Sequence, residues 1–419
     1  MLIVGLDKYK NEWNIKSSNE IKPGLDAIKH ALNLLDNPQD KLSVVHIAGT
    51  NGKGSTLTFI EQIAMHHGLN VGKFMSPCIV DVHDQIQSNG ESITEQEFNQ
   101  IFERMQRAGL SGKLTDFELL TCAAFLYFVN KKVDLVLLET GMGGREDCTN
   151  VVTPIVSVIT SISLEHTKFL GSDISSIAKH KAGIIKHEKP VVVGVLSEDA
   201  MNVIEDEASE KNSPLYVLGR QIHVIPSTNG DRYLNEILGI DISHLNRTLP
   251  GDHQGENMAL AITAFLEVAK HFSVKVDAEK IKEGVHNSKL QGRFEEVLQN
   301  VYFDGAHNPA SAQMLVSTIK QQFPDENIRF IIGMLADKDV KNVLATLETV
   351  SDEFYFVDFS NSRAMNAEQM MKLSKAAKKN VLKDREGFLK SCSKLPGKTI
   401  VTGSLYLLTD LRKEILNVE

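Results

Sequence analysis

The stretch HIAGTNGKGSTLTF, at residues 46–59, has the residue types of a loop that binds phosphate groups. The common pattern for such a loop is G-x-x-x-x-G-K-[ST]. Gly52 and Lys53 supply the Gly-Lys pair, but Ile47 stands at the place of the first glycine. Gly54, rather than a serine or threonine, follows the lysine. The stretch therefore suggests nucleotide chemistry while departing from the usual loop.

The residues of this stretch can each serve a phosphate group. The three glycines of GTNGKG leave the backbone free to turn its N–H groups toward an anion. Lys53 can reach the outer phosphates, and Ser55 or Thr56 can offer a hydroxyl to Mg²⁺. The helix expected after the loop adds the partial positive charge of its N-terminus. A plain glycine-rich turn is the simpler alternative, but the combination of strand, glycines, lysine and hydroxyls favours phosphate binding.

Two further polar residues stand at the ends of strand-like runs. Glu139 lies at the end of VDLVLLET, residues 133–140, and His166 follows PIVSVITSI, residues 154–162. Ligands of open α/β sheets bind at the carboxyl ends of the strands, and a carboxylate there suits Mg²⁺. A capping glutamate and a surface histidine are the alternatives. The parallel placement of the two residues favours a shared site.

Other motifs give weaker signals. Lys181, in AKHKAGIIK, has small and apolar neighbours, and its residue type alone favours a solvated lysine on a helix face. Asp304 and His307, in DGAHNP, follow a strand-like run, and GMLADKD and TGSLYL follow two others. Three polar strand ends indicate one edge that faces a ligand, although each motif alone is weak.

The elements that must position these residues alternate between strands and helices. Strands are expected at 42–49, 71–76, 133–140, 154–162 and 190–196, and helices at 55–68, 94–109, 115–130, 172–186 and 253–272. This alternation is typical of a parallel sheet with helices on both faces. Thr94 provides a T-x-x-E capping signal for the second helix. Short strand-like pieces and an Asn-Gly turn at 212–250 indicate an antiparallel flap.

A second α/β series begins near residue 294. After a hairpin or strand at 293–306, we expect strands at 328–335, 353–359 and 398–403, helices at 311–323, 338–350 and 404–417, and two helices between 359 and 398. The linker is expected at 286–292, which gives domains 1–288 and 289–419. The expected fold is α/β, with a P-loop-type parallel-sheet N-terminal domain and a smaller Rossmann-like C-terminal domain.

Composition narrows the class of protein. A chain of 419 residues with 42% hydrophobic and 24% charged residues predicts a globular protein of two or three domains. A net charge of -9 argues against a nucleic-acid binder. The 4 cysteines are scattered, which indicates neither a zinc site nor a disulfide framework. No run is long enough to span a bilayer, so we expect a cytoplasmic protein without a membrane partner.

The motifs together resemble one family. GTNGKGST, MSP, ETGMGGREDCTN, SLEHTKFLG, IAKHKAGIIK, DGAHNP, MLADKD and TGSLYL occur in this order. They are similar to those of folylpolyglutamate synthase, including its bifunctional dihydrofolate synthase form, in the Mur ligase superfamily. The resemblance implies an ATP-dependent ligase that adds L-glutamate to a folate, or to dihydropteroate, through an acyl phosphate. It also implies a monomer and an N-terminal domain of the ATP-binding Mur-ligase central type.

The resemblance assigns roles residue by residue. It places ATP on Asn51, Gly52, Lys53, Gly54, Ser55, Asn257, Arg293 and Asp304. It places Mg²⁺ on Ser55, Ser76, Glu139 and His166, the pterin pocket at Phe117 and Asp147, and the glutamate site at Ser404. It gives catalytic roles to Lys53, to Lys181 as a carbamylated lysine, and to His307 near the phosphates or the incoming glutamate.

The chain also departs from the family pattern. Glu165 stands before the metal histidine in place of the usual aspartate, Gln85 replaces an arginine in the loop after Ser76, and Leu290 replaces an aromatic residue before Arg293. These changes bear on the substrate contacts rather than on the ATP and metal residues. Two alternatives stay open: another Mur-type amino-acid ligase, and a nucleotide-dependent regulatory ATPase without ligase activity.

Overall fold

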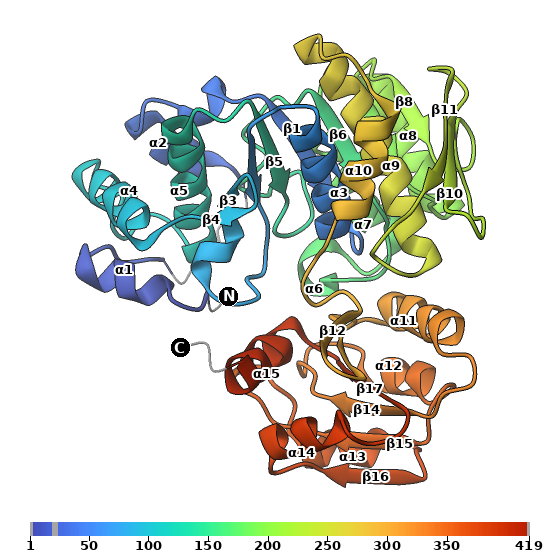
Figure 1. Ribbon diagram of the computed structural model, residues 1–419. Coiled ribbons are helices and arrows are strands. Elements are labelled where there is room, and N and C mark those ends of the chain that lie inside the picture. The colour runs from blue at the N-terminus through green and yellow to red at the C-terminus, as the bar shows by residue number, and fades with distance from the viewer. Residues whose placement is uncertain (1–2, 19–23, 417–419) are drawn as a thin grey trace. The chain divides into compact units, whose positions relative to one another are not determined.

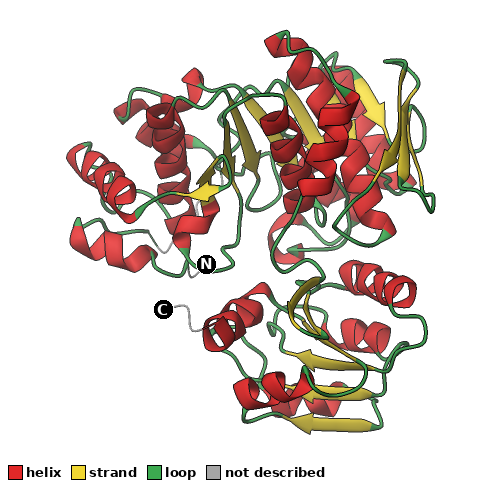
Figure 2. Cartoon of the chain, in the orientation of Figure 1, coloured by secondary structure: helices red, strands yellow, loops and turns green. Residues whose placement is uncertain are grey.

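Two series of parallel strands, each with its own helices, make up the computed structural model, which describes residues 3–18 and 24–416 (Figures 1 and 2). One compact unit comprises Met1–Thr248 and Gln254–Ser288, and the other comprises Leu249–His253 and Lys289–Glu419. The second unit thus includes Leu249–His253, five residues that were predicted to belong to the first domain. No boundary was expected there, because these residues run straight into a long helix. The expected α/β fold class is confirmed.

The sheet of the first unit has the strand order β4-β3-β2-β5-β1-β6-β7-β8. Its strands are β1 (Val44–Ala48), β2 (Val71–Phe74), β3 (Ile86–Ser88), β4 (Glu91–Ser92), β5 (Leu135–Glu139), β6 (Val156–Ile159), β7 (Val191–Val193) and β8 (Leu215–Val217). The six strands from β2 to β8 in this order pair in parallel, and β3 and β4 add an antiparallel hairpin at one edge. Every residue of β1 and β5 is buried, as expected for parallel strands covered on both faces.

The helices of this unit surround the sheet. They are α1 (Leu6–Glu12), α2 (Asp26–Leu34), the 3-10 turns η1 (Pro38–Lys41) and η2 (Val82–Gln85), α3 (Lys53–His66), α4 (Glu95–Arg107), α5 (Asp116–Lys131), α6 (Thr167–Leu170), α7 (Ile174–Ala182), α8 (Glu198–Glu210), α9 (Asp252–Phe272) and α10 (Ala278–Asn287). The capping signal at Thr94 is confirmed, since its side chain accepts from Glu97 N–H while the Glu97 carboxylate accepts from Thr94 N–H. Thr115 forms a second capping box at the start of α5.

The flap is smaller than the sequence predicted. Strands β9 (Ile222–Ile225), β10 (Asp231–Asn235) and β11 (Ile240–Leu245) form a separate three-stranded antiparallel sheet. The piece before them, β8, instead pairs in parallel with β7 at the edge of the large sheet. The prediction of a flap from residue 212 was wrong in this part, because a three-residue strand carries no periodicity that distinguishes the two pairings.

The second unit has a six-stranded sheet of order β12-β13-β17-β14-β15-β16. Its elements are β12 (Glu295–Leu298), β13 (Val301–Phe303), α11 (Pro309–Gln322), β14 (Ile328–Ile332), α12 (Val340–Leu347), β15 (Glu353–Phe356), α13 (Ala367–Leu373), β16 (Lys378–Val381), α14 (Arg385–Cys392), β17 (Lys398–Thr402) and α15 (Leu405–Leu416). The hairpin β12–β13 agrees with the sequence prediction. Strand β16 was missed, because the edge strand KKNV has too few apolar residues to give a strand signal.

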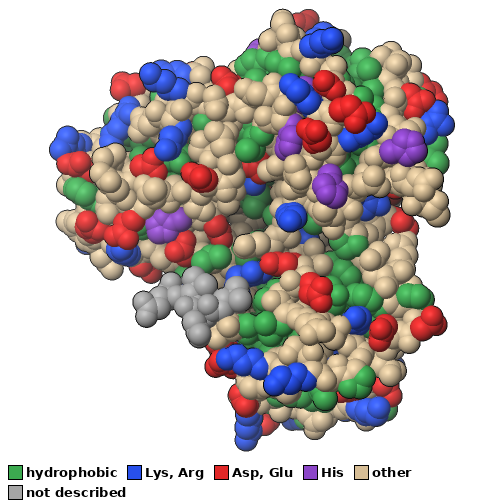
Figure 3. Space-filling view, in the orientation of Figure 1, with side chains coloured by type: hydrophobic (Ala, Val, Ile, Leu, Met, Phe, Trp, Pro, Cys, Tyr) green, Lys and Arg blue, Asp and Glu red, His purple; other side chains and the backbone are tan. Residues whose placement is uncertain are grey.

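Two further observations concern the helices and the charged side chains of the described residues. Within the described residues, none of the helices combines the length and the apolar character needed to cross a bilayer. On the face drawn in Figure 3, acidic and basic side chains are interspersed across the described part of the chain. The sequence as a whole has a net charge of -9.

Candidate active site

The glycine-rich loop lies between the central strand β1 and helix α3. Gly52 immediately precedes the helix with φ 90°, and Lys53 is the first helical residue. The helix N-terminus therefore presents its free N–H groups and partial positive charge at this loop. The Lys53 ammonium donates to the Gly49 carbonyl at 2.9 Å and lies 3.6 Å from a carboxylate oxygen of Glu139. The loop thus has the geometry of an anion site, with its lysine held by protein groups.

The segment that follows β6 braces this loop. Asn51 N–H donates to the Ser161 hydroxyl at 2.9 Å, and the Thr160 and Ser161 hydroxyls both donate to the Asn51 carbonyl. The Thr50 hydroxyl donates to the Ser163 carbonyl at 3.2 Å and accepts from Ser163 N–H at 3.1 Å. These residues were not predicted from the sequence. Their signal was the hydroxyl-rich run TSIS directly after a buried strand.

Asn257, on α9, lies against the same loop. Its amide oxygen is 3.4 Å from the Thr56 hydroxyl, and its amide nitrogen donates to Gln254 at 3.0 Å. A Cβ atom on Gly52 would come within 2.4 Å of the Asn257 amide oxygen. The structure therefore brings together two predicted nucleotide residues that are far apart in the sequence.

The contact between Gly52 and Asn257 gives a testable prediction. Gly52→Ala would place a methyl group against Asn257 and an alanine at positive φ, which costs about 1–2 kcal/mol. We expect about tenfold weaker binding of ATP, the factor that corresponds to about 1.4 kcal/mol, in a fluorescence titration with a nucleotide analogue.

Gly68→Ala is the matched control for this variant. Gly68 follows the other end of α3 with φ 88°, and a Cβ atom there would meet nothing within 4 Å. Both variants share the backbone strain, so Gly68→Ala measures the loss of thermal stability that this strain causes without a clash. Equal ATP affinities for the two variants would contradict the placement of Gly52 and Asn257 in a nucleotide site.

The predicted metal ligands follow neighbouring strands of the sheet. Ser76 follows β2, Glu139 is the last residue of β5, and His166 follows β6, while the glycine-rich loop follows β1. Since β2, β5, β1 and β6 are adjacent and parallel, these residues leave the sheet at one edge. Glu139 is buried, whereas His166 is exposed. Ser55, in the first turn of α3, is buried at the same edge.

His166 has an unusual backbone. Its φ of 51° and ψ of 36° lie in the left-handed region, where it begins the short helix α6. Its Nε2 atom lies 3.5 Å from the carboxylate of Glu165, the residue that replaces the usual aspartate. Such strained non-glycine residues cluster at functional sites. The longer Glu165 side chain still reaches the histidine ring.

Lys181 lies in the interior rather than on a solvated helix face. It belongs to the last turn of α7 and is only 3% exposed. The expectation of a solvated lysine, which rested on residue type alone, was therefore wrong. Burial and then the nearby Lys53 cation lower the pKa of Lys181 to about 7, against the opposing effect of Glu165 and Asp147. A substantial part of this lysine is therefore an uncharged amine near neutral pH.

The glycine-rich turn after β5 connects the predicted acceptor residues. The ring of Phe117 packs against Gly141, where a Cβ atom would be 2.4 Å from its Cε1 atom. Asp147 is 7% exposed and accepts hydrogen bonds from Met142 N–H at 2.7 Å and from Thr149 N–H at 3.0 Å. Burial raises the pKa of Asp147, and these hydrogen bonds oppose that shift. Asp147 thus belongs to the loop after β5, and Phe117 packs against the same loop.

Three predicted residues meet in the second unit. Asp304 follows β13 and accepts from Phe294 N–H at 3.0 Å and Ala306 N–H at 2.9 Å. Burial raises the pKa of Asp304, against the effect of Arg293 and these hydrogen bonds. Arg293 packs over Gly305, where a Cβ atom would be 2.4 Å from its Nη1 atom. His307 Nδ1 donates to the Gly305 carbonyl at 2.9 Å, which fixes the tautomer of the neutral ring.

The remaining predicted positions have structural contacts of their own. Ser404, buried after β17, accepts from Tyr406 N–H at 3.2 Å at the start of α15. Gln85 is buried, and its amide donates to the Met75 carbonyl at 3.2 Å. Its side chain is neutral and lacks the charge of the arginine that it replaces. Leu290 is half-buried and belongs to the second unit. Nothing in these contacts selects a substrate.

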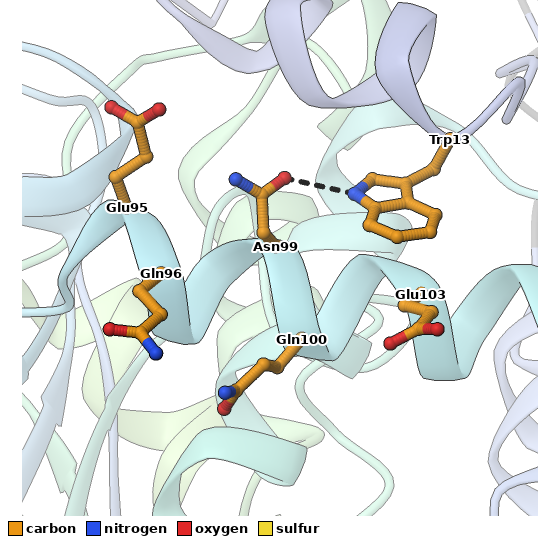
Figure 4. A pocket seen from close by; sticks show the side chains of 6 residues that line it. All are labelled: Trp13, Glu95, Gln96, Asn99, Gln100 and Glu103. Carbon is orange, nitrogen blue, oxygen red and sulfur yellow. Dashed lines mark hydrogen bonds between the residues drawn. The ribbon is translucent and has the colours of Figure 1, made fainter.

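The hollow drawn in Figure 4 lies elsewhere, between the end of α1 and α4. It measures about 500 Å³, and its lining residues are Trp13, Glu95, Gln96, Asn99, Gln100 and Glu103. The Trp13 indole N–H donates to the Asn99 amide oxygen at 2.9 Å across its rim. This lining contains two carboxylates and no cation, so it does not suit a triphosphate.

Comparison with known proteins identifies the family. The family model of the Mur ligase middle domain matches residues 47–265, and that of the Mur ligase glutamate ligase domain matches residues 292–404. The dihydrofolate synthase/folylpolyglutamate synthase of Bacillus subtilis (strain 168) is 34% identical over 412 residues, which cover 94% of this chain and 95% of that protein. The solved structure of E. coli FolC in complex with DHPP and ADP has a TM-score of 0.89 at 30% identity and covers 98% of both chains.

A further solved structure extends this likeness. A bifunctional folylpolyglutamate synthase/dihydrofolate synthase with Mn, AMPPNP and L-glutamate bound has a TM-score of 0.85 at 28% identity, over 99% of this chain and 98% of that chain. The two family models match in sequence order, and the relative is similar over 95% of its length. The chain belongs to the Mur ligase family and, within it, to the folylpolyglutamate synthases and dihydrofolate synthases.

Proposed function

We propose that this protein is an ATP-dependent ligase that joins L-glutamate, through its α-amino group, to the carboxylate of a folate or of dihydropteroate. The observation that carries the proposal is the glycine-rich loop with Lys53 at the N-terminus of α3, beside Glu139 at the same sheet edge. Relatives with this fold bind ADP with a folate-type ligand, or a nucleotide with L-glutamate.

The geometry fits a two-step amide synthesis. In the first step, a carboxylate oxygen of the acceptor attacks the γ-phosphorus of ATP, the bond to the β-phosphate oxygen breaks and ADP leaves. In the second step, the glutamate amine attacks the acyl carbon and inorganic phosphate leaves. Phosphoryl transfer depends on positioning and on charge neutralisation, which Lys53 and the free N–H groups of α3 supply. We assign the first contacts of the outer phosphates to these groups.

The second unit contributes the other predicted contacts. Arg293 and Asp304 are assigned to ATP, with the carboxylate of Asp304 on the ribose side. Because His307 Nδ1 donates to a carbonyl, Nε2 is the basic nitrogen of its ring. We assign this nitrogen to the proton that the glutamate ammonium group must lose before it attacks. Ser404 remains assigned to the glutamate site by resemblance.

The residues at the sheet edge fit Mg²⁺. The hydroxyls of Ser55 and Ser76, the carboxylate of Glu139 and the imidazole of His166 are hard or borderline donors suited to it. Among the described residues, His, Cys, Asp and Glu side chains form no group of three that could hold a metal. Mg²⁺ commonly keeps waters and phosphate oxygens in its coordination shell, so a partial protein shell agrees with this. When bound, the metal neutralises the phosphate charge.

Lys181 is proposed to carry a carbamate. A neutral amine is the form that attacks CO₂, giving a carbamate and a proton, and the lowered pKa of about 7 provides this form. The buried site places Lys181 near the Lys53 cation. Carbamylation would replace a repulsion between two cations by an attraction between opposite charges. The neighbouring cation and the burial therefore both favour the modified side chain.

Another Mur-type amino-acid ligase is the alternative function, because ATP and metal residues would serve it equally. The relatives named for folate favour the first proposal. A regulatory ATPase is disfavoured, since nucleotide switching does not require a glutamate ligase domain at residues 292–404. A monomeric state, a cytoplasmic location and the lack of a nucleic-acid partner remain predictions from the sequence.

Substrate dependence tests the proposed function. Purified protein with ATP and Mg²⁺ should release phosphate only when L-glutamate and either tetrahydrofolate or dihydropteroate are both present. Mass spectrometry should then find the acceptor enlarged by one glutamyl residue. Offering the two acceptors separately decides between the two activities. Phosphate release that is equally fast without an acceptor would refute the proposal, and activity only with another amino acid would select the alternative.

A further inference from the structure

A buried hydrogen-bond chain links the strand before the phosphate loop to the loop that contains Asp147. His46, on β1, is 0% exposed, and its Nε2 atom lies 2.9 Å from the Thr149 hydroxyl oxygen. The Thr149 hydroxyl donates to the Asp147 carboxylate at 2.5 Å. A hydroxyl has only one hydrogen to donate, so His46 must donate to Thr149 from Nε2. The three side chains therefore form a directed chain from His46 to Asp147.

The tautomer of His46 follows from this chain. With the hydrogen on Nε2, Nδ1 is an acceptor, and it has no hydrogen-bond partner among the described residues. Burial lowers the pKa of His46 to about 3, so the ring is neutral. Its neighbours on the strand, Val45 and Ile47, are fully buried apolar residues. A polar ring with one unsatisfied nitrogen is costly at such a position. We therefore attribute the role of His46 to its hydrogen bond with the Thr149 hydroxyl.

The hydrogen bond from His46 holds the loop after β5. This loop contains Asp147 and contacts Phe117, the two residues assigned to the acceptor substrate. The loop begins directly after Glu139, and the ring of Phe117 packs on Gly141. A Cβ atom on Gly144 would be 3.1 Å from the Lys181 carbonyl oxygen. Asp147 closes the loop on itself by accepting from Met142 N–H. The position of Asp147 thus sets the path of the backbone between these groups.

We propose that His46 and Thr149 are positioning residues that hold Asp147 and its loop in place for the acceptor substrate. This inference rests on the proposed function, because it uses the assignment of Phe117 and Asp147 to the acceptor. The chain from His46 through the Thr149 hydroxyl holds one oxygen of Asp147 together with Thr149 N–H, and Met142 N–H holds the other oxygen. Loss of the chain should therefore impair the acceptor and leave the ATP contacts in place.

Variants of Thr149 test the chain from the loop side. Thr149→Val keeps the shape of the residue and removes its hydroxyl, whereas Thr149→Ser keeps the hydroxyl. We expect Thr149→Val to raise the KM for the acceptor about tenfold, which corresponds to about 1.4 kcal/mol, while Thr149→Ser remains close to the wild type. The KM for ATP should change by less than about twofold. An equal rise of both KM values would refute the inference.

Thr263→Val is the matched control. The Thr263 hydroxyl is also fully buried and lies 2.8 Å from the Tyr233 hydroxyl, between α9 and the flap. This variant removes a comparable hydrogen bond at a place that the inference does not involve. It should lower the thermal stability as Thr149→Val does, without raising the KM for the acceptor. Equal kinetic effects of the two valine variants would reduce the role of Thr149 to stability.

Variants of His46 test the other end of the chain. His46→Leu should raise the KM for the acceptor. His46→Gln should keep this KM close to that of the wild type, because glutamine offers an N–H near the position of Nε2. The double variant His46→Leu/Thr149→Val should resemble either single variant, because both remove one interaction. Additive effects would show that the residues act independently and would overturn the proposal.

A spectroscopic measurement covers the case in which the His46 variants do not fold. Nitrogen-15 NMR of the wild-type imidazole should show a hydrogen on Nε2 of His46 and none on Nδ1. Thr149→Val should change the Nε2 signal, whereas Thr263→Val should not. A hydrogen on Nδ1 would contradict the directed chain. A wild-type protein that shows the expected signals but ligates no folate-type acceptor would refute the proposed function alone.

Discussion

Lys53→Met is expected to lower the turnover number by about 100-fold or more, comparable with the loss of one group that stabilises developing charge in an active site. The Lys53 ammonium lies at the N-terminus of α3, 2.9 Å from the Gly49 carbonyl and 3.6 Å from Glu139. We propose that it moves from these protein groups to the outer phosphates of ATP. Methionine keeps the apolar stem and removes the charge, so the loss reports the charge. Steady-state phosphate release with both substrates measures it.

The same variant also removes the ammonium group that lies 3.6 Å from Glu139. This carboxylate is 5% exposed, so the loss of a neighbouring charge can alter its interactions. The double variant Lys53→Met/Glu139→Gln removes both charges and separates this indirect effect from the loss of phosphate neutralisation. If the double variant regains turnover, the lysine acts through Glu139 rather than on the phosphates. Wild-type turnover in Lys53→Met would contradict the assignment of the loop.

Lys181→Ala is expected to reduce turnover by about 100-fold, and a short carboxylic acid such as acetate should restore part of it. The proposed carbamate supplies a negative charge in a buried site, and a small carboxylate can occupy the space that the truncated side chain leaves. Lys179→Ala is the matched control, because Lys179 is exposed on the same helix. A lack of rescue at any concentration, with the control fully active, would count against carbamylation.

The pH dependence of activation by bicarbonate gives a second measurement on Lys181. The pKa of Lys181 is lowered to about 7, chiefly by burial, so the free amine becomes scarce as the pH falls through this value. Activation by bicarbonate should therefore be present above about pH 7 and be lost below it. The stability of the protein with an unmodified Lys181 depends on pH in the same direction. Unfolding restores the ordinary pKa and takes up a proton, so stability rises with pH above about 7. Activation that is insensitive to pH would contradict the proposal.

The sequence predicted the parts of the fold that have strong periodic signals. The fully buried strands β1 and β5, the capping box at Thr94 and the glycine-rich turn into α3 are examples. It missed β16, whose residues are largely polar, and it assigned β8 to the flap. Both errors concern edge strands of three or four residues, where pairing rather than residue type decides the structure.

The candidate site was predictable to the extent that its residues have distinctive chemistry. Lys53, Glu139 and His166 were predicted because each stands at or soon after the end of a strand, next to glycine or polar residues. The burial of Lys181 could not be predicted, since small and apolar neighbours in a helix do not reveal which face is covered. The bracing hydroxyls after β6 were hidden because serine and threonine are common in loops.

The brace between the phosphate loop and the segment after β6 has a thermodynamic consequence. Asn51 bonds to Ser161 in both directions, Thr50 does so to Ser163, and the same segment continues into His166. A nucleotide that shifts the loop must shift the backbone leading to this histidine. With His166 assigned to Mg²⁺, as proposed above, nucleotide and metal affinities would be linked. Linkage requires each ligand to change the affinity of the other by the same factor.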